Sequence, residues 1–420
     1  MRFYCGNPVY CCEIALERLF FKRPKVRESL EDNYLYDRII SCLHNNCSMV
    51  IGIDASQTIN EQKTGVQWYV YHLLRELKRI IPPTHRVRLY TPQPLPLDFK
   101  PLPLHWEERV LSWPFRQGWT LIRLSRELRA NSPDVFFTPG HIIPPFIPCS
   151  SAVTIHDLAF RDFPNSYAHP RLMNMLHARD AKKANAIMVP SNATLDAVVQ
   201  AYAINPEKIH VISHGYDAEA YHPYHDAEIQ EALNHYGIKK PYVISVGRLE
   251  EKKNTLSVLQ LVQAYRHVEF DSTSRINDLR LVLVGRRGYG YEKIKQWITH
   301  NKAGSWVHEL GWLPSEETAK LICGASAFIT LSRAEGFGFT ILEALACGTS
   351  VLASNIPSHR EIGKELVIYT DPNNLTESTN KLISLINQPA VNLTDKPTNR
   401  LTEFTWYHSA QQTLDVILSL

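Results

Sequence analysis

The chain has 420 residues, of which 44% are hydrophobic and 21% are charged. This length predicts about two domains, and the composition is that of an ordinary globular protein, which excludes a disordered or fibrous class. The formal net charge is only +3, and basic and acidic side chains nearly balance within both 49–236 and 237–420, so the basic footprint of a nucleic-acid-binding protein is missing. Charges or prolines interrupt every apolar run before about 18 residues, and we expect no transmembrane helix.

Residues 1–48 stand apart from the rest of the chain, because the first buried strand pattern begins only at Met49. Glu13, Glu17 and Arg18 interrupt the one apolar stretch that resembles a secretory signal, so we expect a cytoplasmic location. The leading segment is interpreted as an N-terminal extension.

The extension contains an amphipathic stretch at 12–23, followed by the basic residues Lys22, Arg23, Lys25 and Arg27. Apolar side chains beside a basic cluster are typical of peripheral contact at the inner face of a membrane. The same periodicity is typical of a helix that packs on a neighbouring domain, and both interpretations stay open.

The eight cysteines are too few for a disulfide scaffold in a chain of this length, so we expect reduced thiols. Five of them crowd into the first 47 residues, where Cys42 and Cys47 flank His44. Because the paired Cys-x2-Cys spacing of zinc sites is missing, the sequence does not favour a zinc site there.

From Met49 onward, short apolar strands alternate with amphipathic helices, as in parallel sheets covered on both faces. Apolar residues at helical spacing behind Thr64 and Gly65 predict a helix that completes a first βαβ unit. The proline-rich segment 92–103 predicts an extended surface loop. The strands of this first series are expected at 49–55, 86–91, 134–138, 151–156, 186–190 and 208–213.

A polar segment at 216–240, which contains Pro223, separates this series from a second one, and we place the domain boundary at residue 236. The sequence thus predicts an α/β chain with two Rossmann-like domains, at 49–236 and 237–420. The strands of the second series are expected at 241–246, 279–284, 307–310, 327–332, 350–354 and 366–370.

The stretch 327–355 combines a buried strand pattern with a glycine-containing loop that carries Glu335. A short helix follows from about Thr340 and ends at Gly348, which suits a left-handed cap. Glu343 is the one carboxylate in this apolar helix, and a buried carboxylate needs hydrogen-bond donors, such as the hydroxyls of a ribose. The alternative is a tight strand–loop–helix connection with two surface glutamates.

The loop before this helix favours an anion. Gly336 and Gly338 let the main chain approach a ligand closely, and the N–H groups at a helix start attract negative charge. A diphosphate fits such a position.

A second phosphate-binding pattern lies at 242–254, where Arg248 and Lys253 bracket a loop ahead of a helix that Asn254 could cap. Two cations at a helix N-terminus oppose the helix dipole unless an anion joins them. The alternative is a solvated run of charges. Both patterns follow strands of one predicted sheet, at the carboxyl edge where open α/β folds bind ligands.

The stretches EGFGFTILEALACG and VGRLEEKKN closely resemble the glycosyl transferase group 1 domain of glycosyltransferase family 4. Glu335 and Glu343 match the Glu-x7-Glu motif of that family. The resemblance spans about 49–420, and the matching segments look most like those of bacterial mannosyltransferases. Further matching segments are TGVQ (64–67), HDLAFRDFP (156–164), PSNAT (190–194), KIHVISHGYD (208–217) and FTWYHSAQQTLDV (404–416).

The resemblance implies a GT-B fold, in which two Rossmann-like domains face each other across a cleft and a last helix, at about 403–420, crosses back to the first domain. It also implies a retaining hexosyltransferase, with mannose from GDP-mannose as the favoured transfer, in polysaccharide or lipopolysaccharide synthesis. The expected partners are a nucleotide diphosphate sugar and a glycan acceptor that could be lipid-linked, and no nucleic acid.

Site roles follow from the same resemblance. The expected catalytic residues are Glu335 near the donor sugar, His156 on that sugar, and Arg248 and Lys253 on the diphosphate. The expected donor-binding residues are Glu343 on the ribose, the loop residues Gly336, Phe337, Gly338 and Phe339, the glycine-loop residue Gly65, and Gly285 and Arg286 near the base.

Two features depart from the family pattern. The family often has Asn before the glycine where this chain has His214 and Gly215, and it lacks an equivalent of residues 1–48. For His156 considered without the resemblance, the alternative to a contact with the donor sugar is a purely structural role, as a histidine at a strand end bonded to Asp157.

No Asp-x-Asp pair, which would hold a divalent ion on a diphosphate, occurs in the sequence. We therefore expect no metal and no cofactor, because Arg248 and Lys253 can neutralise the leaving diphosphate. A donor with a UDP group, or a non-catalytic subunit that binds nucleotide sugars, remains an alternative. A dinucleotide-dependent oxidoreductase is disfavoured because the GxGxxG fingerprint is missing.

Overall fold

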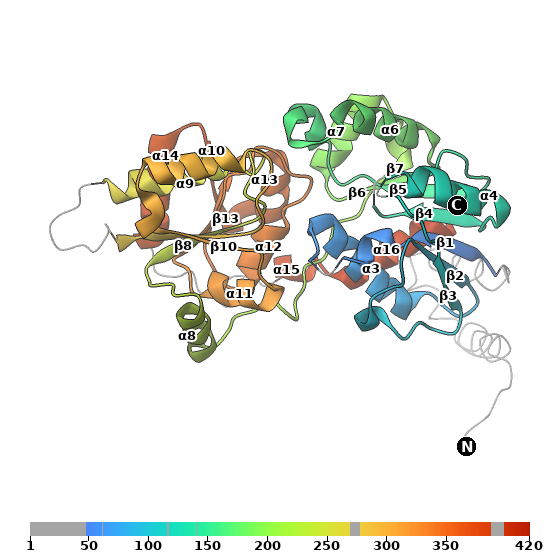
Figure 1. Cartoon of the computed structure of the whole chain (residues 1–420), viewed down its shortest axis with the longest axis horizontal. Coiled ribbons are helices and arrows are strands. Elements are labelled where there is room, and N and C mark those ends of the chain that lie inside the picture. The colour runs from blue at the N-terminus through green and yellow to red at the C-terminus, as the bar shows by residue number, and fades with distance from the viewer. Residues whose placement is uncertain (1–47, 61, 116, 141, 269–277, 388–398) are drawn as a thin grey trace, which may run out of the picture.

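The computed structural model describes residues 48–60, 62–115, 117–140, 142–268, 278–387 and 399–420. They form two parallel-sheet domains that lie side by side (Figure 1). The hypotheses about the cysteine cluster and the amphipathic stretch fall on residues 1–47, outside the described residues.

The first domain is built on a seven-stranded sheet in which every pairing is parallel, in the order β3-β2-β1-β4-β5-β6-β7. Its central strands, such as β1 and β4, are short and buried on both faces, as the runs of Val, Ile and Phe require. The strands are β1 (Val50–Asp54), β2 (Arg86–Thr91), β3 (Trp106–Val110), β4 (Val135–Thr138), β5 (Ser150–Thr154), β6 (Ala186–Val189) and β7 (Ile209–Val211). The helices of this part of the chain are α3 (Gly65–Ile80), α4 (Ser125–Ala130), α5 (Ala159–Asp162), α6 (Pro170–Lys183) and α7 (Asn192–Tyr202).

The second domain has a six-stranded parallel sheet in the order β10-β9-β8-β11-β12-β13. Its strands are β8 (Tyr242–Val246), β9 (Arg280–Val284), β10 (Val307–Gly311), β11 (Ala327–Thr330), β12 (Val351–Ser354) and β13 (Val367–Thr370). The helices that follow in the chain are α8 (Asp226–His235), α9 (Thr255–Arg266), α10 (Tyr291–His300), α11 (Ser315–Cys323), α12 (Phe339–Ala346), α13 (Pro357–Gly363), α14 (Leu375–Asn387), α15 (Asn399–Thr402) and α16 (Trp406–Leu418).

Each strand predicted from the sequence is present within one or two residues, but β3 was not predicted. Its sequence, WEERV, carries three charges and shows no apolar alternation. As an edge strand it pairs only with β2, and it buries Trp106 while Glu107 pairs with Arg88 at 3.5 Å. Strand pairing and ion pairs therefore hold β3 in place, and neither produces a hydrophobic pattern in its sequence.

The proline-rich segment is only partly the surface loop that was predicted. Leu97 is exposed, but Leu95 and Phe99 are buried in the core of the first domain, and residues 97–99 form a turn of 3-10 helix. Two apolar anchors therefore fix this segment to the sheet.

The helix α8 belongs to the core of the second domain, because Ile229 and Leu233 pack in the cluster that contains residues of α11 and α12. A boundary at residue 236 would leave this helix in the first domain. The chain therefore passes between the domains before Asp226.

The last helix, α16, lies against α3 of the first domain (Figure 1). Trp406, Ala410 and Leu414 join the hydrophobic core of that domain. A Cβ atom at Gly215 would lie 2.3 Å from the main-chain nitrogen of Trp406, so only glycine allows the two segments to cross here. Among the described residues, no helix has the length and apolar character needed to span a membrane.

Candidate functional site

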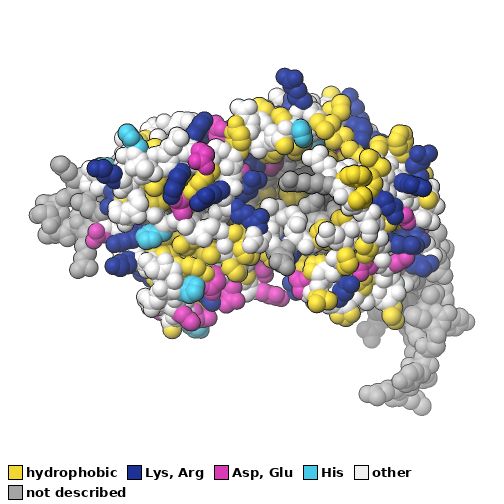
Figure 2. Space-filling model, in the orientation of Figure 1, with side chains coloured by type: hydrophobic (Ala, Val, Ile, Leu, Met, Phe, Trp, Pro, Cys, Tyr) yellow, Lys and Arg dark blue, Asp and Glu magenta, His cyan; other side chains and the backbone are white. Residues whose placement is uncertain are grey.

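The two domains meet along the carboxyl ends of their strands. Ser191, the N-cap of α7, and Thr194 both donate hydroxyl hydrogen bonds to the carbonyl oxygen of Gly336, at 2.6 and 3.0 Å. From the second domain, the carboxylate of Glu361 accepts the main-chain N–H of Asn192 at 2.9 Å. The surface is hollowed where the domains meet, with Lys and Arg side chains at the edge on the side of the second domain (Figure 2).

An ion pair also crosses between the domains. The ammonium of Lys252 lies 3.3 Å from a carboxylate oxygen of Asp157 and 3.5 Å from the hydroxyl of Tyr167. Lys252 is buried, which alone would lower its pKa, but the charges of Asp157 and then Glu335 outweigh burial and raise that pKa. The cation is therefore held charged between the domains.

Lys253 and Glu335, which come from the two phosphate-binding patterns, form an ion pair. Ser332 donates a second hydrogen bond to the same carboxylate at 2.7 Å. Burial would raise the pKa of Glu335, but Lys253 and Lys252 outweigh it and lower the pKa to about 2. Glu335 is thus a carboxylate at every physiological pH.

Glu343 lies on α12 in the opposite electrostatic situation. Burial, and next the negative charge of Asp217, raise its pKa to about 8, although Lys253 partly offsets them. No described residue donates a hydrogen bond to its carboxylate. The predicted need of Glu343 for outside hydrogen-bond donors therefore stands, and the charge of Lys253 acts on both glutamates.

His156 is buried and fully oriented by its neighbours. Its Nε2 lies 2.8 Å from the carbonyl oxygen of Pro139, and since a carbonyl only accepts, Nε2 carries the proton. Its Nδ1 then accepts from Nε2 of His214 at 3.4 Å. Burial lowers the pKa of His156 to about 4, so the ring is neutral. The charge of Asp157 acts on the same ring and partly offsets the effect of burial on its pKa.

The aromatic residues of the glycine loop are mainly structural. The ring of Phe339 stacks on His214 at 5.2 Å, and Phe337 is buried against His214 and Phe404. Their rings join the domains, because both contact His214 of the first domain. A Cβ atom at Gly65 would lie 3.9 Å from Phe339, which places the start of α3 beside the loop.

The remaining predicted residues surround the same edge. A Cβ atom at Gly285 would lie 1.9 Å from the carbonyl oxygen of Gly247, so the loops after β8 and β9 touch through glycine. Arg286 reaches the first domain and donates to Gln62. Arg248 is about half exposed and pairs with Glu250 at 3.4 Å, apart from the Lys253 pair.

Several residues that lack an assigned role in the sequence analysis belong to this site: His214, Asp217, Ser191, Thr194 and Lys252. All of them lie within segments that carry the family resemblance, Lys252 in VGRLEEKKN. Of these five residues, only His214 was singled out from the sequence, as a departure from the family pattern.

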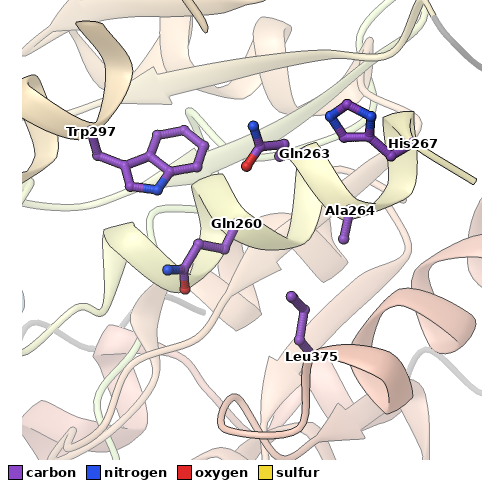
Figure 3. A pocket seen from close by; sticks show the side chains of 6 residues that line it. All are labelled: Gln260, Gln263, Ala264, His267, Trp297 and Leu375. Carbon is purple, nitrogen blue, oxygen red and sulfur yellow. The ribbon is translucent and has the colours of Figure 1, made fainter. Parts of the chain in front are cut away.

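An open pocket of about 630 Å³ lies elsewhere, on the second domain (Figure 3). It is lined by Gln260, Gln263, Ala264, His267, Trp297 and Leu375. None of these residues belongs to the motifs: Gln260, Gln263 and Ala264 lie in the later turns of α9, Trp297 lies in α10, and Leu375 begins α14.

We predict that Gly336→Ala lowers turnover by about 10²-fold, because a small displacement of catalytic groups has that effect. A Cβ atom there would lie 1.7 Å from the carbonyl oxygen of His156, a main-chain atom of the other domain. Turnover and the radius of gyration in solution, with and without donor, measure the effect. Gly304→Ala is the matched control, since nothing lies within 4 Å of its Cβ position. Normal turnover of the Gly336 variant would mean that the close contact between Gly336 and His156 is not needed for activity.

Comparison with family models gives two matches that follow one another along the chain. Residues 63–220 match Glycosyltransferase Family 4, and residues 226–403 match Glycosyl transferases group 1. Among curated proteins, the O-antigen chain mannosyltransferase B of Escherichia coli is 24% identical over 319 residues, which are 74% of this chain and 80% of that protein. The alpha-maltose-1-phosphate synthase of Mycolicibacterium smegmatis is 25% identical over 254 residues, 56% of this chain and 62% of that protein.

Solved structures with the same fold include HepE of Anabaena in complex with UDP and glucose, with a TM-score of 0.69 and 17% identity. The similarity covers 89% of this chain and 100% of that one. WaaG, a glycosyltransferase involved in lipopolysaccharide biosynthesis, has a TM-score of 0.67 and 13% identity, with 88% and 99% of the two chains covered. These likenesses establish the GT-B fold.

Proposed function

Since the chain belongs to glycosyltransferase family 4, we propose that it transfers a hexose from a nucleoside diphosphate sugar to a glycan acceptor in polysaccharide or lipopolysaccharide synthesis. GDP-mannose is the favoured donor, because an O-antigen mannosyltransferase matches most of the chain. The transfer retains the anomeric configuration of the donor.

The observation that supports this proposal best is the ion pair between Lys253 and Glu335 at the strand ends. In the proposed reaction, Lys253 and Arg248 neutralise the leaving diphosphate, as electrostatic stabilisation of a developing charge requires. Glu335 keeps Lys253 in place and lies near the sugar, while Glu343 accepts hydrogen bonds from the ribose. We propose that no metal takes part.

His156 acts in this proposal as a neutral polar group rather than as a proton acceptor. Both ring nitrogens are occupied by Pro139 and His214, and its low pKa makes it a weak base. His214 is a positioning residue for this ring.

The test is nucleotide release from a panel of donors, with the products identified by chromatography. We expect GDP from GDP-mannose, released at the same rate in excess EDTA, and an α-linked product by NMR. Release of UDP from UDP-sugars, with no release from GDP-mannose, would mean that the donor is a UDP-sugar. A requirement for Mg²⁺ or Mn²⁺ would mean that the reaction depends on a metal. No release from any donor, with binding retained, would favour a non-catalytic subunit.

A further inference from the structure

The first domain carries exposed apolar side chains on two helical segments. On the segment 119–130, where a π-helical stretch (119–124) continues into α4, Ile122 is 58% exposed and precedes Arg126 and Arg129 by four and seven residues. Both arginines are exposed. A large apolar side chain that points to solvent beside two cations is unusual for a core-packed helix.

The helix α6 repeats this pattern. Leu172 and Met175 are 45% and 61% exposed, and Lys182 follows on the same face at helical spacing. Arg171 and Lys183, at the two ends of the helix, are also exposed. Two helical segments thus present the same combination of apolar and basic side chains.

The loop before β5 joins the two patterns into one surface. The guanidinium of Arg129 lies 5.5 Å from the ring centre of Phe146, which is 64% exposed. From the other side, the ammonium of Lys183 donates to the carbonyl oxygen of Pro145 at 2.5 Å. Figure 2 shows hydrophobic side chains gathered with Lys and Arg over the region where α6 and α4 lie in Figure 1.

The acidic residues of the two helices are neutralised within the protein. Glu127 pairs with Arg123 at 3.3 Å, and Asp180 is buried and pairs with Arg179 at 2.5 Å. The outward charge is therefore positive, although the whole chain carries a formal net charge of only +3.

We propose that this surface, the α4–α6 face, docks on an anionic phospholipid bilayer. It is defined by the apolar residues Ile122, Phe146, Leu172 and Met175 and by the basic residues Arg126, Arg171 and Lys182. A protein interface has a contiguous apolar centre with a polar rim, whereas here single apolar side chains alternate with cations on convex helices. Such an arrangement fits a headgroup layer, where apolar side chains enter the acyl boundary and cations stay among the phosphates.

The position of the face suits a membrane-bound acceptor. The helix α6 begins three residues after Tyr167, whose hydroxyl lies 3.5 Å from Lys252 of the other domain. The face therefore borders the junction between the domains. The inference needs neither residues 1–48 nor any particular donor.

The test is sedimentation of the full chain with vesicles of phosphatidylcholine mixed with phosphatidylglycerol, and with phosphatidylcholine alone. The triple variant Arg126→Gln, Arg171→Gln, Lys182→Gln should lower the partition coefficient on mixed vesicles at least tenfold, since each cation near an anionic leaflet contributes about a fivefold factor. The matched control is Lys239→Gln, Lys240→Gln, Lys293→Gln, which removes the same charge from exposed positions of the second domain. Thermal melting verifies that both variants fold.

A second pair of variants tests the apolar part. The double variant Leu172→Gln, Met175→Gln should bind mixed vesicles more weakly. The binding that remains should be electrostatic and should disappear at high salt. Leu97→Gln with Leu104→Gln, two exposed leucines away from the face, should have no effect. The proposal is overturned if the chain does not sediment with mixed vesicles, if phosphatidylcholine alone binds it equally, or if face and control variants behave alike.

Discussion

Lys253→Ala is expected to lower kcat/KM for the donor by about 10²–10³-fold, which corresponds to roughly 3 to 4 kcal/mol of transition-state stabilisation. The variant loses the cation proposed to face the leaving diphosphate, and it leaves the Glu335 carboxylate without its ion-pair partner. Because the charge of Lys253 lowers the pKa of both Glu335 and Glu343, its removal raises the pKa of both groups. Steady-state kinetics at saturating acceptor measures this loss.

The neighbouring residue provides the control. Lys252→Ala also removes a buried cation, but one that pairs with Asp157 between the domains, 3.3 Å away. It should mainly affect the contact between domains. Equal losses in the two variants would mean that Lys253 has no special place at the diphosphate, and an unchanged rate for Lys253→Ala would remove it from the site.

The order of strands and helices was readable from the sequence because parallel strands covered on both faces are continuous apolar runs. The exception, β3, is an edge strand whose one buried residue is Trp106. Its stability depends on pairing with β2, which no local pattern contains. Likewise, Leu95 and Phe99 anchor the proline-rich segment through contacts with residues distant in sequence.

The candidate site shows a similar division. Glu335 and Lys253 were predicted from separate motifs, and the structure brings them together because β8 and β11 are neighbours in the sheet. Contacts between the domains could not be predicted in this way. The hydrogen bond from Ser191 to Gly336 joins residues 145 apart in the sequence, and the hydrogen bond from Lys252 to Asp157 joins residues 95 apart.

A further expected result concerns Glu343→Gln, which should stabilise the donor-free protein at alkaline pH while weakening donor binding. The pKa of Glu343 is raised from its ordinary value of 4.5 to about 8, because burial and Asp217 disfavour the charge. The folded chain therefore holds this proton more tightly than the unfolded chain. Its stabilising contribution is complete below pH 4.5 and is lost as the pH rises through about 8.

Glutamine cannot ionise, so the variant should escape this loss. Above pH 8 we expect its free energy of unfolding to exceed that of the wild type by on the order of 2 kcal/mol, since one pKa unit corresponds to about 1.4 kcal/mol and solvent screens part of the effect. At pH 5 the two proteins should melt alike. Above pH 8, where Glu343 is ionised, donor affinity should fall, because an amide offers one acceptor oxygen where the carboxylate offers two to ribose hydroxyls.

Glu335→Gln is the matched control, and the sign of its effect is reversed. The pKa of Glu335 is lowered to about 2, so its charge stabilises the folded protein above pH 4.5, and that contribution is lost as the pH falls through about 2. This variant should be less stable than the wild type at neutral and alkaline pH. Thermal melting of the three proteins across pH 5 to 9 distinguishes the cases. If Glu343→Gln and Glu335→Gln shift stability in the same direction at alkaline pH, the two glutamates do not have the opposite electrostatic environments from which their separate roles are inferred.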